Sequence, residues 1–248
     1  MKWCIMFFCL VAGWCLAGEV QVDYQAIGRQ VWANSAVKKP HAMVRWQRGQ
    51  LFAEMGLGFV WYPAGRSGAY DESFPRFVAF AEAQGVRVPS YLHGVAPWGD
   101  FAAFQEDSST LKASMEKWLA AHVAVQAQYL VARAHASLPA MMRGSAKPQH
   151  VQECFEALAR SQQGLLCLVD YLCFMGDGSR PESPRTGLLQ VLEAANVAAL
   201  SGEAPAREFC RAAEWTLRRY AENAPNEKAA AVELMERLKR VRSYVRKN

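Results

Sequence analysis

The chain has 248 residues, of which 52% are hydrophobic, and its 28 Lys and Arg against 23 Asp and Glu give a formal net charge of +5. About 230 residues follow the N-terminal segment described next, a size that suits one domain, or two small ones, with ample material for a core. The sequence carries no serine-hydrolase elbow, phosphate-binding loop or nucleotide fingerprint, so the enzyme classes that need them are excluded.

The first eighteen residues predict a signal peptide. Lys2 gives the positive start, residues 3–14 form an apolar or small run, and small residues precede a cleavage point near Ala17 or Gly18. The run is shorter than the roughly 20 apolar residues of a transmembrane helix, and no later segment approaches that length. We therefore expect a periplasmic or secreted protein without a transmembrane segment after signal removal, and no nucleic-acid partner.

The first part of the mature chain predicts helices around one small β element. A helical spacing of apolar residues covers residues 20–34. The glycine-punctuated aromatic run of residues 51–62 predicts a β-hairpin. Residues 72–84 predict a short amphipathic helix closed by Gly85, and the proline- and glycine-rich residues 88–99 predict an ordered loop.

Longer helices are predicted for the rest of the chain. A capping signal starts a pattern that runs to about Ser137, where a Leu-Pro pair stops it, which predicts one long central helix over residues 109–137. The further predicted helices span residues 148–160, 162–175, 187–200, 205–223 and the segment from 226 onwards. We therefore predict a mainly α (α+β) fold with a single domain over residues 19–248.

The stretch from Met55 to Pro63 reads Met-Gly-Leu-Gly-Phe-Val-Trp-Tyr-Pro. It resembles the Gly-Ile-Gly-His-Phe-Ile-Trp-Tyr-Pro block of a family of secreted bacterial proteins of largely unassigned function. That block is similar to the Gly-x-Gly-His hairpin of phage-type lysozymes, in which a catalytic glutamate ends the first helix and the hairpin forms one wall of the sugar-binding cleft. The resemblance implies a lysozyme-like helical domain.

This chain departs from the family at the positions that carry its chemistry. The Asn-Glu pair of the family reads Asn34-Ser35, and the histidine reads Phe59. A glycosidase needs a carboxylic acid that protonates the glycosidic oxygen, and a serine hydroxyl cannot replace it. Glu54, just before the glycine pair, is a candidate for a relocated acid, although an exposed residue at a strand edge is the interpretation that we favour.

Two later segments resemble further blocks of the same family, and together with the first block and the C-terminal stretch of residues 218–225 the resemblance spans nearly the whole mature chain. They are residues 170–178 and 187–193, where a glutamate and an asparagine of the family are replaced by Asp177 and Cys173. Asp177 is the second candidate for a relocated carboxylate. The start of the later block is also similar to the Gly-Leu-Met-Gln element of lytic transglycosylases, but the Glu182-Ser183 pair stands too close upstream for that arrangement.

The resemblance implies a groove without catalysis that binds peptidoglycan or an envelope protein. Its candidate binding residues are Asn34, Gly56, Gly58, Trp61, Tyr62, Gln126, Asp170 and Gln190. Gln126 shares a helix face with His122, Tyr129 and Arg133, which would line a saccharide groove or belong to a structural network. We favour the structural network, and an active peptidoglycan hydrolase with a relocated carboxylate is the alternative function.

The cysteines and the basic residues each allow two interpretations. Four cysteines follow the signal peptide, and in an exported chain they form disulfides or serve as buried thiols. Their spacing predicts no metal centre, and no cofactor is expected. Five cations near the C-terminus either contact an anionic envelope polymer or complement a helix dipole, and we favour the dipole: Lys239, Arg240, Arg242, Arg246 and Lys247.

Overall fold

The computed structural model describes residues 21–35, 42–68, 70–179, 186–200, 204–223 and 227–245. In this part of the chain the protein is mainly helical with one small antiparallel sheet, which confirms the predicted fold class at that level. None of its helices has the length and apolar character needed to cross a membrane. The predicted signal peptide, residues 1–18, lies outside the described residues.

The sheet has three short strands: β1 (Val44–Arg45), β2 (Ala53–Met55) and β3 (Phe59–Trp61). They pair antiparallel in the order β1-β2-β3, so β2 is the central strand. The hairpin predicted at residues 51–62 corresponds to β2 and β3, whereas β1 lies before it and was not predicted. A strand of two residues is too short to show a hydrophobic alternation.

Four short elements surround the sheet on one side of α1 (Tyr24–Ser35). They are α2 (Phe74–Ala83), the 3-10 turn η2 (Ser90–Leu92), α3 (Phe101–Glu106) and α4 (Leu111–Ala121). Helix α2 contacts β3, and α4 contacts β1. The predicted loop over residues 88–99 therefore contains one 3-10 turn, and α3 was not predicted.

The prediction of a single long helix over residues 109–137 is wrong. The chain forms α4 and then α5 (Val123–Gly144), with a break at His122, whose φ and ψ are −116° and 30°. Helix α1 crosses α5 at this break, where a Cβ on Gly28 would lie 2.8 Å from the carbonyl oxygen of Val123. Helix α5 also continues through Pro139, which has no N–H and so cannot donate a backbone hydrogen bond within the helix.

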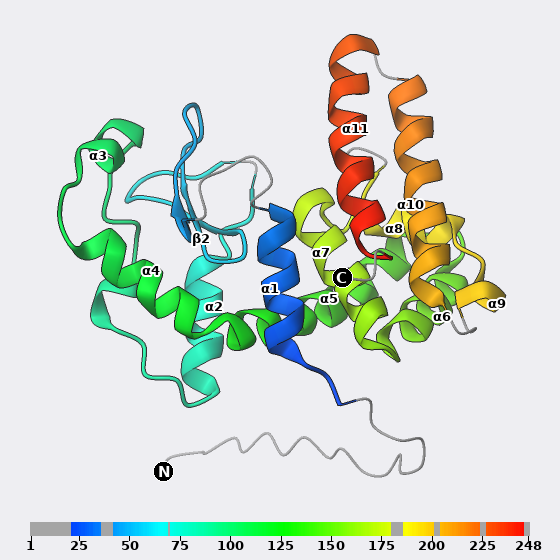
Figure 1. The fold of residues 1–248 in the computed structure, drawn as a ribbon, viewed down its shortest axis with the longest axis horizontal. Coiled ribbons are helices and arrows are strands. Elements are labelled where there is room, and N and C mark those ends of the chain that lie inside the picture. Colours follow the sequence, from blue (N-terminus) through cyan, green and yellow to red (C-terminus); the bar gives the residue numbers. More distant parts are fainter. Residues whose placement is uncertain are drawn as a thin grey trace, which may run out of the picture.

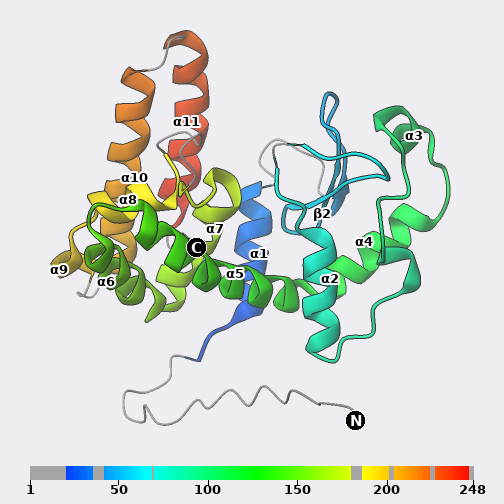
Figure 2. The same ribbon diagram turned by 180° about the vertical axis from the view of Figure 1, so that it is seen from behind.

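The remaining helices lie on the other side of α1 (Figures 1 and 2). They are α6 (Pro148–Ala159), α7 (Gln162–Met175), α8 (Leu188–Ala194), α9 (Val197–Leu200), α10 (Pro205–Glu222) and α11 (Glu227–Ser243). The helix predicted over residues 187–200 is divided because Ala195 is extended and Asn196 accepts a hydrogen bond from the backbone N–H of Ala198.

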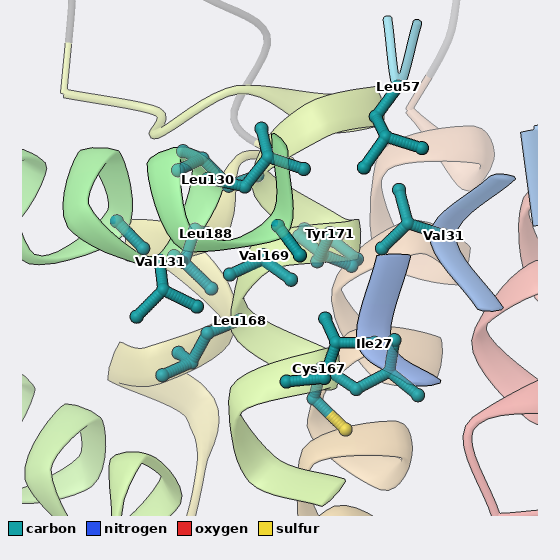
Figure 3. Packing of buried hydrophobic residues seen from close by; sticks show 14 of the residues in the cluster. Ile27, Val31, Leu57, Leu130, Val131, Cys167, Leu168, Val169, Tyr171 and Leu188 are labelled. Atoms are coloured by element: carbon teal, nitrogen blue, oxygen red, sulfur yellow. The ribbon is translucent and has the colours of Figure 1, made fainter. Parts of the chain in front are cut away.

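One hydrophobic core connects both sides of α1. Helix α7 lies at its centre, with every residue from 164 to 172 buried. Figure 3 shows Leu57, from the turn between β2 and β3, pointing towards Val31 of α1. The turn of the hairpin therefore packs against the helix that ends at Ser35.

Candidate functional site

Ser35 is the last residue of α1, and it is only half-buried. Its hydroxyl donates a hydrogen bond of 2.8 Å to the carbonyl oxygen of Trp32 in its own helix. The neighbouring Asn34 is buried and accepts a hydrogen bond from Gln30 at 2.9 Å. The hydroxyl of Ser243 in α11 lies 3.1 Å from the same Asn34 oxygen, but its closer acceptor is the carbonyl oxygen of Arg240 at 2.6 Å. Ser35 and Asn34 therefore bind mainly within their own helix, and Asn34 also contacts α11.

The hairpin turn is built around Gln126 of α5, which is fully buried. Its side-chain oxygen accepts from the backbone N–H of Leu57 at 3.0 Å, and its nitrogen donates to the carbonyl oxygen of Leu119 at 2.7 Å. Gly56 has a φ of +52°, and a Cβ there would lie 2.0 Å from the Gln126 oxygen. These contacts favour the structural network over the saccharide groove, because Gln126 is used up in holding the turn.

Phe59, which the resemblance aligns with a histidine, lies in the core. Its ring stacks on Phe77 at a centroid distance of 4.7 Å and meets the ring of Tyr129 edge-on at 5.5 Å. Its side chain is 0% exposed. The side chain of Phe59 therefore offers a substrate no polar group.

Trp61 and Tyr62 fix the far end of the hairpin instead of opening to solvent. The indole N–H of Trp61 donates to the carbonyl oxygen of Gly94 at 2.9 Å. The hydroxyl of Tyr62 donates to the carbonyl oxygen of Tyr70 at 3.1 Å, and burial raises the pKa of Tyr62. Both of these candidate binding residues are buried, and they connect the hairpin to the loops on either side.

Glu54 is neither exposed nor at a sheet edge, so that interpretation is wrong. It lies on the central strand β2 opposite Arg45, and only 15% of its side chain is exposed. Arg45 donates to one carboxylate oxygen at 2.6 Å and Gln47 to the other at 3.3 Å. Two further guanidinium nitrogens of Arg45, Nε and Nη1, are buried without a partner in the described chain.

Asp170 is fully buried in α7 and is paired with the last turns of α11. Arg240 donates to both of its oxygens at 2.8 Å, and the hydroxyl of Tyr244 donates to it at 2.5 Å. Burial and the charge of Asp170 raise the pKa of Tyr244 well above its usual range. This predicted binding residue therefore anchors α11 to the core.

The basic cluster at the C-terminus is in part structural. Arg240 pairs with Asp170, and Arg242 pairs with Glu214 of α10 at 2.8 and 2.9 Å. Lys239 is exposed, while the two remaining cations, residues 246 and 247, lie outside the described residues. Neither of the two interpretations of the cluster included these helix-to-helix ion pairs.

The two later family-like segments, residues 170–178 and 187–193, contact each other. The carbonyl oxygen of Asp177 accepts from the N–H of Leu189, and a Cβ on Gly187 would lie 2.4 Å from the Cα of Gly178. Gln190 donates to the carbonyl oxygen of Gly178 at 3.2 Å. The Asp177 carboxylate accepts from the backbone N–H of Ser179, so both polar residues close a turn.

The four cysteines among the described residues are free thiols in the structure: Cys154, Cys167, Cys173 and Cys210. Burial raises the pKa of Cys173 to about 11 and that of Cys154 and Cys210 to about 12. Burial also raises the pKa of Cys167 well above its usual range. Thiols of this kind are unreactive near neutral pH. Among the described residues, no group of three or more His, Cys, Asp or Glu is placed to hold a metal ion.

Comparisons with protein-family models, with curated proteins and with solved structures found no match.

The sequence did not predict the two arginines that pair with buried carboxylates. Arg45 neutralises Glu54, and Arg240 neutralises Asp170. For Asp170 a signal was present, because a carboxylate in an unbroken apolar helix requires a buried partner. The sequence does not indicate which cation provides it, since the partner lies 70 residues away.

Proposed function

We propose that the protein is an exported cell-envelope protein with a lysozyme-like scaffold that binds glycan, or an envelope protein, without cleaving it. The proposal is supported mainly by the contacts of Ser35 and Phe59, the two positions at which the resembling family has a glutamate and a histidine. Ser35 returns its hydroxyl to its own helix, and Phe59 is stacked inside the core. Neither residue offers the proton that a glycosidase must deliver to the glycosidic oxygen.

The alternative is an active hydrolase that uses a relocated carboxylate, Glu54 or Asp177. The contacts of both residues make this less favourable. Each oxygen of Glu54 already accepts a hydrogen bond, one of them from a guanidinium at 2.6 Å. Asp177 uses one oxygen to close its own turn. A general acid has to present a proton to the substrate, and a carboxylate that serves as an acceptor for buried donors is poorly suited to that task.

Release of muropeptides from purified peptidoglycan tests the proposal. We expect no release by the wild-type protein, and none by Glu54→Gln or Asp177→Asn. Glu106→Gln is the matched control, since Glu106 is an exposed carboxylate on α3. Release by the wild type that survives in Glu106→Gln and is lost in Glu54→Gln or Asp177→Asn would overturn the proposal in favour of the active hydrolase.

Export rests on the sequence of residues 1–18 and has its own test. We expect the protein isolated from the periplasm or the medium to begin at Gly18 or Glu19, as read by N-terminal sequencing. A full-length protein that still begins at Met1 and remains in the cytoplasm would contradict this part of the proposal.

A further inference from the structure

A cavity of about 500 Å³ opens at the end of α1 that is remote from Ser35. Four helices form it: the first half of α1, the starts of α7 and α10, and the end of α11. Its size falls in the range of about 300–1,000 Å³ that is typical of small-molecule sites. None of the candidate residues from the sequence lines it, so it is a separate place on the molecule.

Three glutamine amides line this cavity, and each is held at one end only. Gln30 donates to Asn34, Gln163 donates to the carbonyl oxygen of Tyr244, and Gln162 accepts from the backbone N–H of Asp23. A glutamine amide carries two donors and one acceptor group. The other end of each amide has no partner in the described chain, so pre-oriented donors and acceptors remain for a ligand.

The cavity has one charged lining residue, Arg207 in the first turn of α10. Arg207 is exposed, and within the described residues it forms no ion pair and no acidic side chain lines the cavity. The carboxylate of the adjacent Glu208 is already bound by Arg211 and by the backbone N–H of Asn196. An unpaired guanidinium beside a polar cavity suits a carboxylate, which it binds with two parallel hydrogen bonds.

Two serines, Ser161 and Ser243, also line the cavity, and the remaining lining residues include an apolar surface that suits a hydrocarbon side chain. This surface comes from Leu166, from the half-buried Pro205 and from Val245, which is 41% exposed. A sugar acid has no hydrocarbon group for such a surface. A peptide has the apolar side chain, the backbone amides and the terminal carboxylate that the three kinds of lining residue would meet.

We propose that this cavity binds the C-terminal end of a short peptide, with its free carboxylate on Arg207, its backbone amides on the three glutamines and an apolar side chain against Leu166 and Val245. The proposal goes beyond the proposed function and does not depend on it, because the cavity shares none of its lining residues with the hairpin.

Calorimetric titration with N-acetyl-Ala-Ala-Leu tests the proposal. We expect the peptide with a free carboxylate to bind at least about tenfold more tightly than its C-terminal amide, since a charge-assisted bidentate contact is lost in the amide. Arg207→Gln should weaken binding of the acid by a similar factor and leave the amide unaffected. Arg66→Gln is the matched control, an exposed arginine far along the chain, and should bind as the wild type does.

Ala26→Trp fills the cavity from a half-buried position on α1 and should abolish binding, with an unchanged circular dichroism spectrum as the folding control. Equal affinity for the acid and the amide, or binding that persists in both Arg207→Gln and Ala26→Trp, would overturn the proposal. Absence of binding by the wild type, or tighter binding of glucuronic acid than of the peptide, would also overturn it. Each of these outcomes is independent of muropeptide release.

Discussion

The two ends of α1 differ in how their polar side chains are used. At the hairpin end, Gln126, Trp61 and Glu54 all form hydrogen bonds inside the protein. At the other end, Arg207 and one end of Gln162 have no partner in the described chain. The segment that resembles an active site, residues 55–63, is therefore packed into the core here. The cavity lies at the other end of α1, where no sequence motif predicted a site.

The largest expected effect is the loss of the buried pair that holds α11. Asp170→Ala leaves Arg240 and the hydroxyl of Tyr244 without their acceptor in the core. Removing one partner of a buried ion pair costs about 3–5 kcal/mol, and we expect the free energy of unfolding in urea to fall by that amount. Because Tyr244 lines the cavity, peptide binding should be lost as well.

Glu214→Ala is the matched control for that variant. It removes a pair between α10 and α11 in which the Arg242 side chain is 45% exposed. Exposed pairs contribute about 0–1 kcal/mol, so the two variants should differ by several-fold in their cost. Similar losses in both would show that Asp170 is not the anchor of α11.

The hairpin end is tested by Gly56→Ala. The new Cβ would displace the Gln126 oxygen that accepts from Leu57, and the φ of +52° is unfavourable for alanine. Left-handed strain and one unpaired buried N–H together predict a loss of about 2–4 kcal/mol in the free energy of unfolding. Gly49→Ala, at a φ of +88° with nothing within 4 Å of its Cβ, should cost only the strain, about 1–2 kcal/mol. Equal costs would mean that Gln126 yields freely and that the turn is loosely held.

A glutamate at position 35 tests whether the end of α1 suits an acid. Ser35→Glu places a carboxylate at the C-terminus of a helix, in a half-buried position. The helix dipole and the burial both disfavour the charge, so we expect a loss of about 1–3 kcal/mol at neutral pH. Ser35→Gln, of the same size without the charge, should lose less. If Ser35→Glu unfolds at the same urea concentration as the wild type or later, the site is more open than its contacts indicate.

The smallest expected effect lies on the surface of the hairpin side, between His93 and Glu82. Their hydrogen bond of 3.0 Å raises the pKa of His93 above 6.5. The pair therefore stabilises the fold fully below pH 6.5, and this contribution is lost as pH rises through the raised pKa. Glu82→Gln should lower the pKa of His93, followed by an NMR titration of its ring protons. An unchanged titration curve would show that the pair does not persist in solution.

The fold was predictable from the sequence where an element is long and one face is buried. The helices around residues 148–160, 162–175 and 205–223 carry that signal and lie within a few residues of α6, α7 and α10. The break at His122 depends on the close approach of Gly28 to Val123, which no local pattern shows.

For the candidate site, the sequence predicted where the hairpin lies but not which contacts its side chains make. The glycine-aromatic block marked the hairpin correctly, because its glycines at positive φ have few substitutes. The roles of its residues depend on partners distant in the sequence, as for Trp61 and Gly94 or Gln126 and Leu57. The cavity draws its lining from four separate segments, so its existence follows from tertiary packing alone.

Co-sedimentation with intact peptidoglycan sacculi is the most direct test of the central claim that this protein binds the envelope without cleaving it. We predict that the mature wild-type protein is retained in the pellet, in proportion to the sacculi added, while the supernatant contains no released muropeptides. Muropeptides in the supernatant, in amounts that grow with time and protein concentration, would contradict the account.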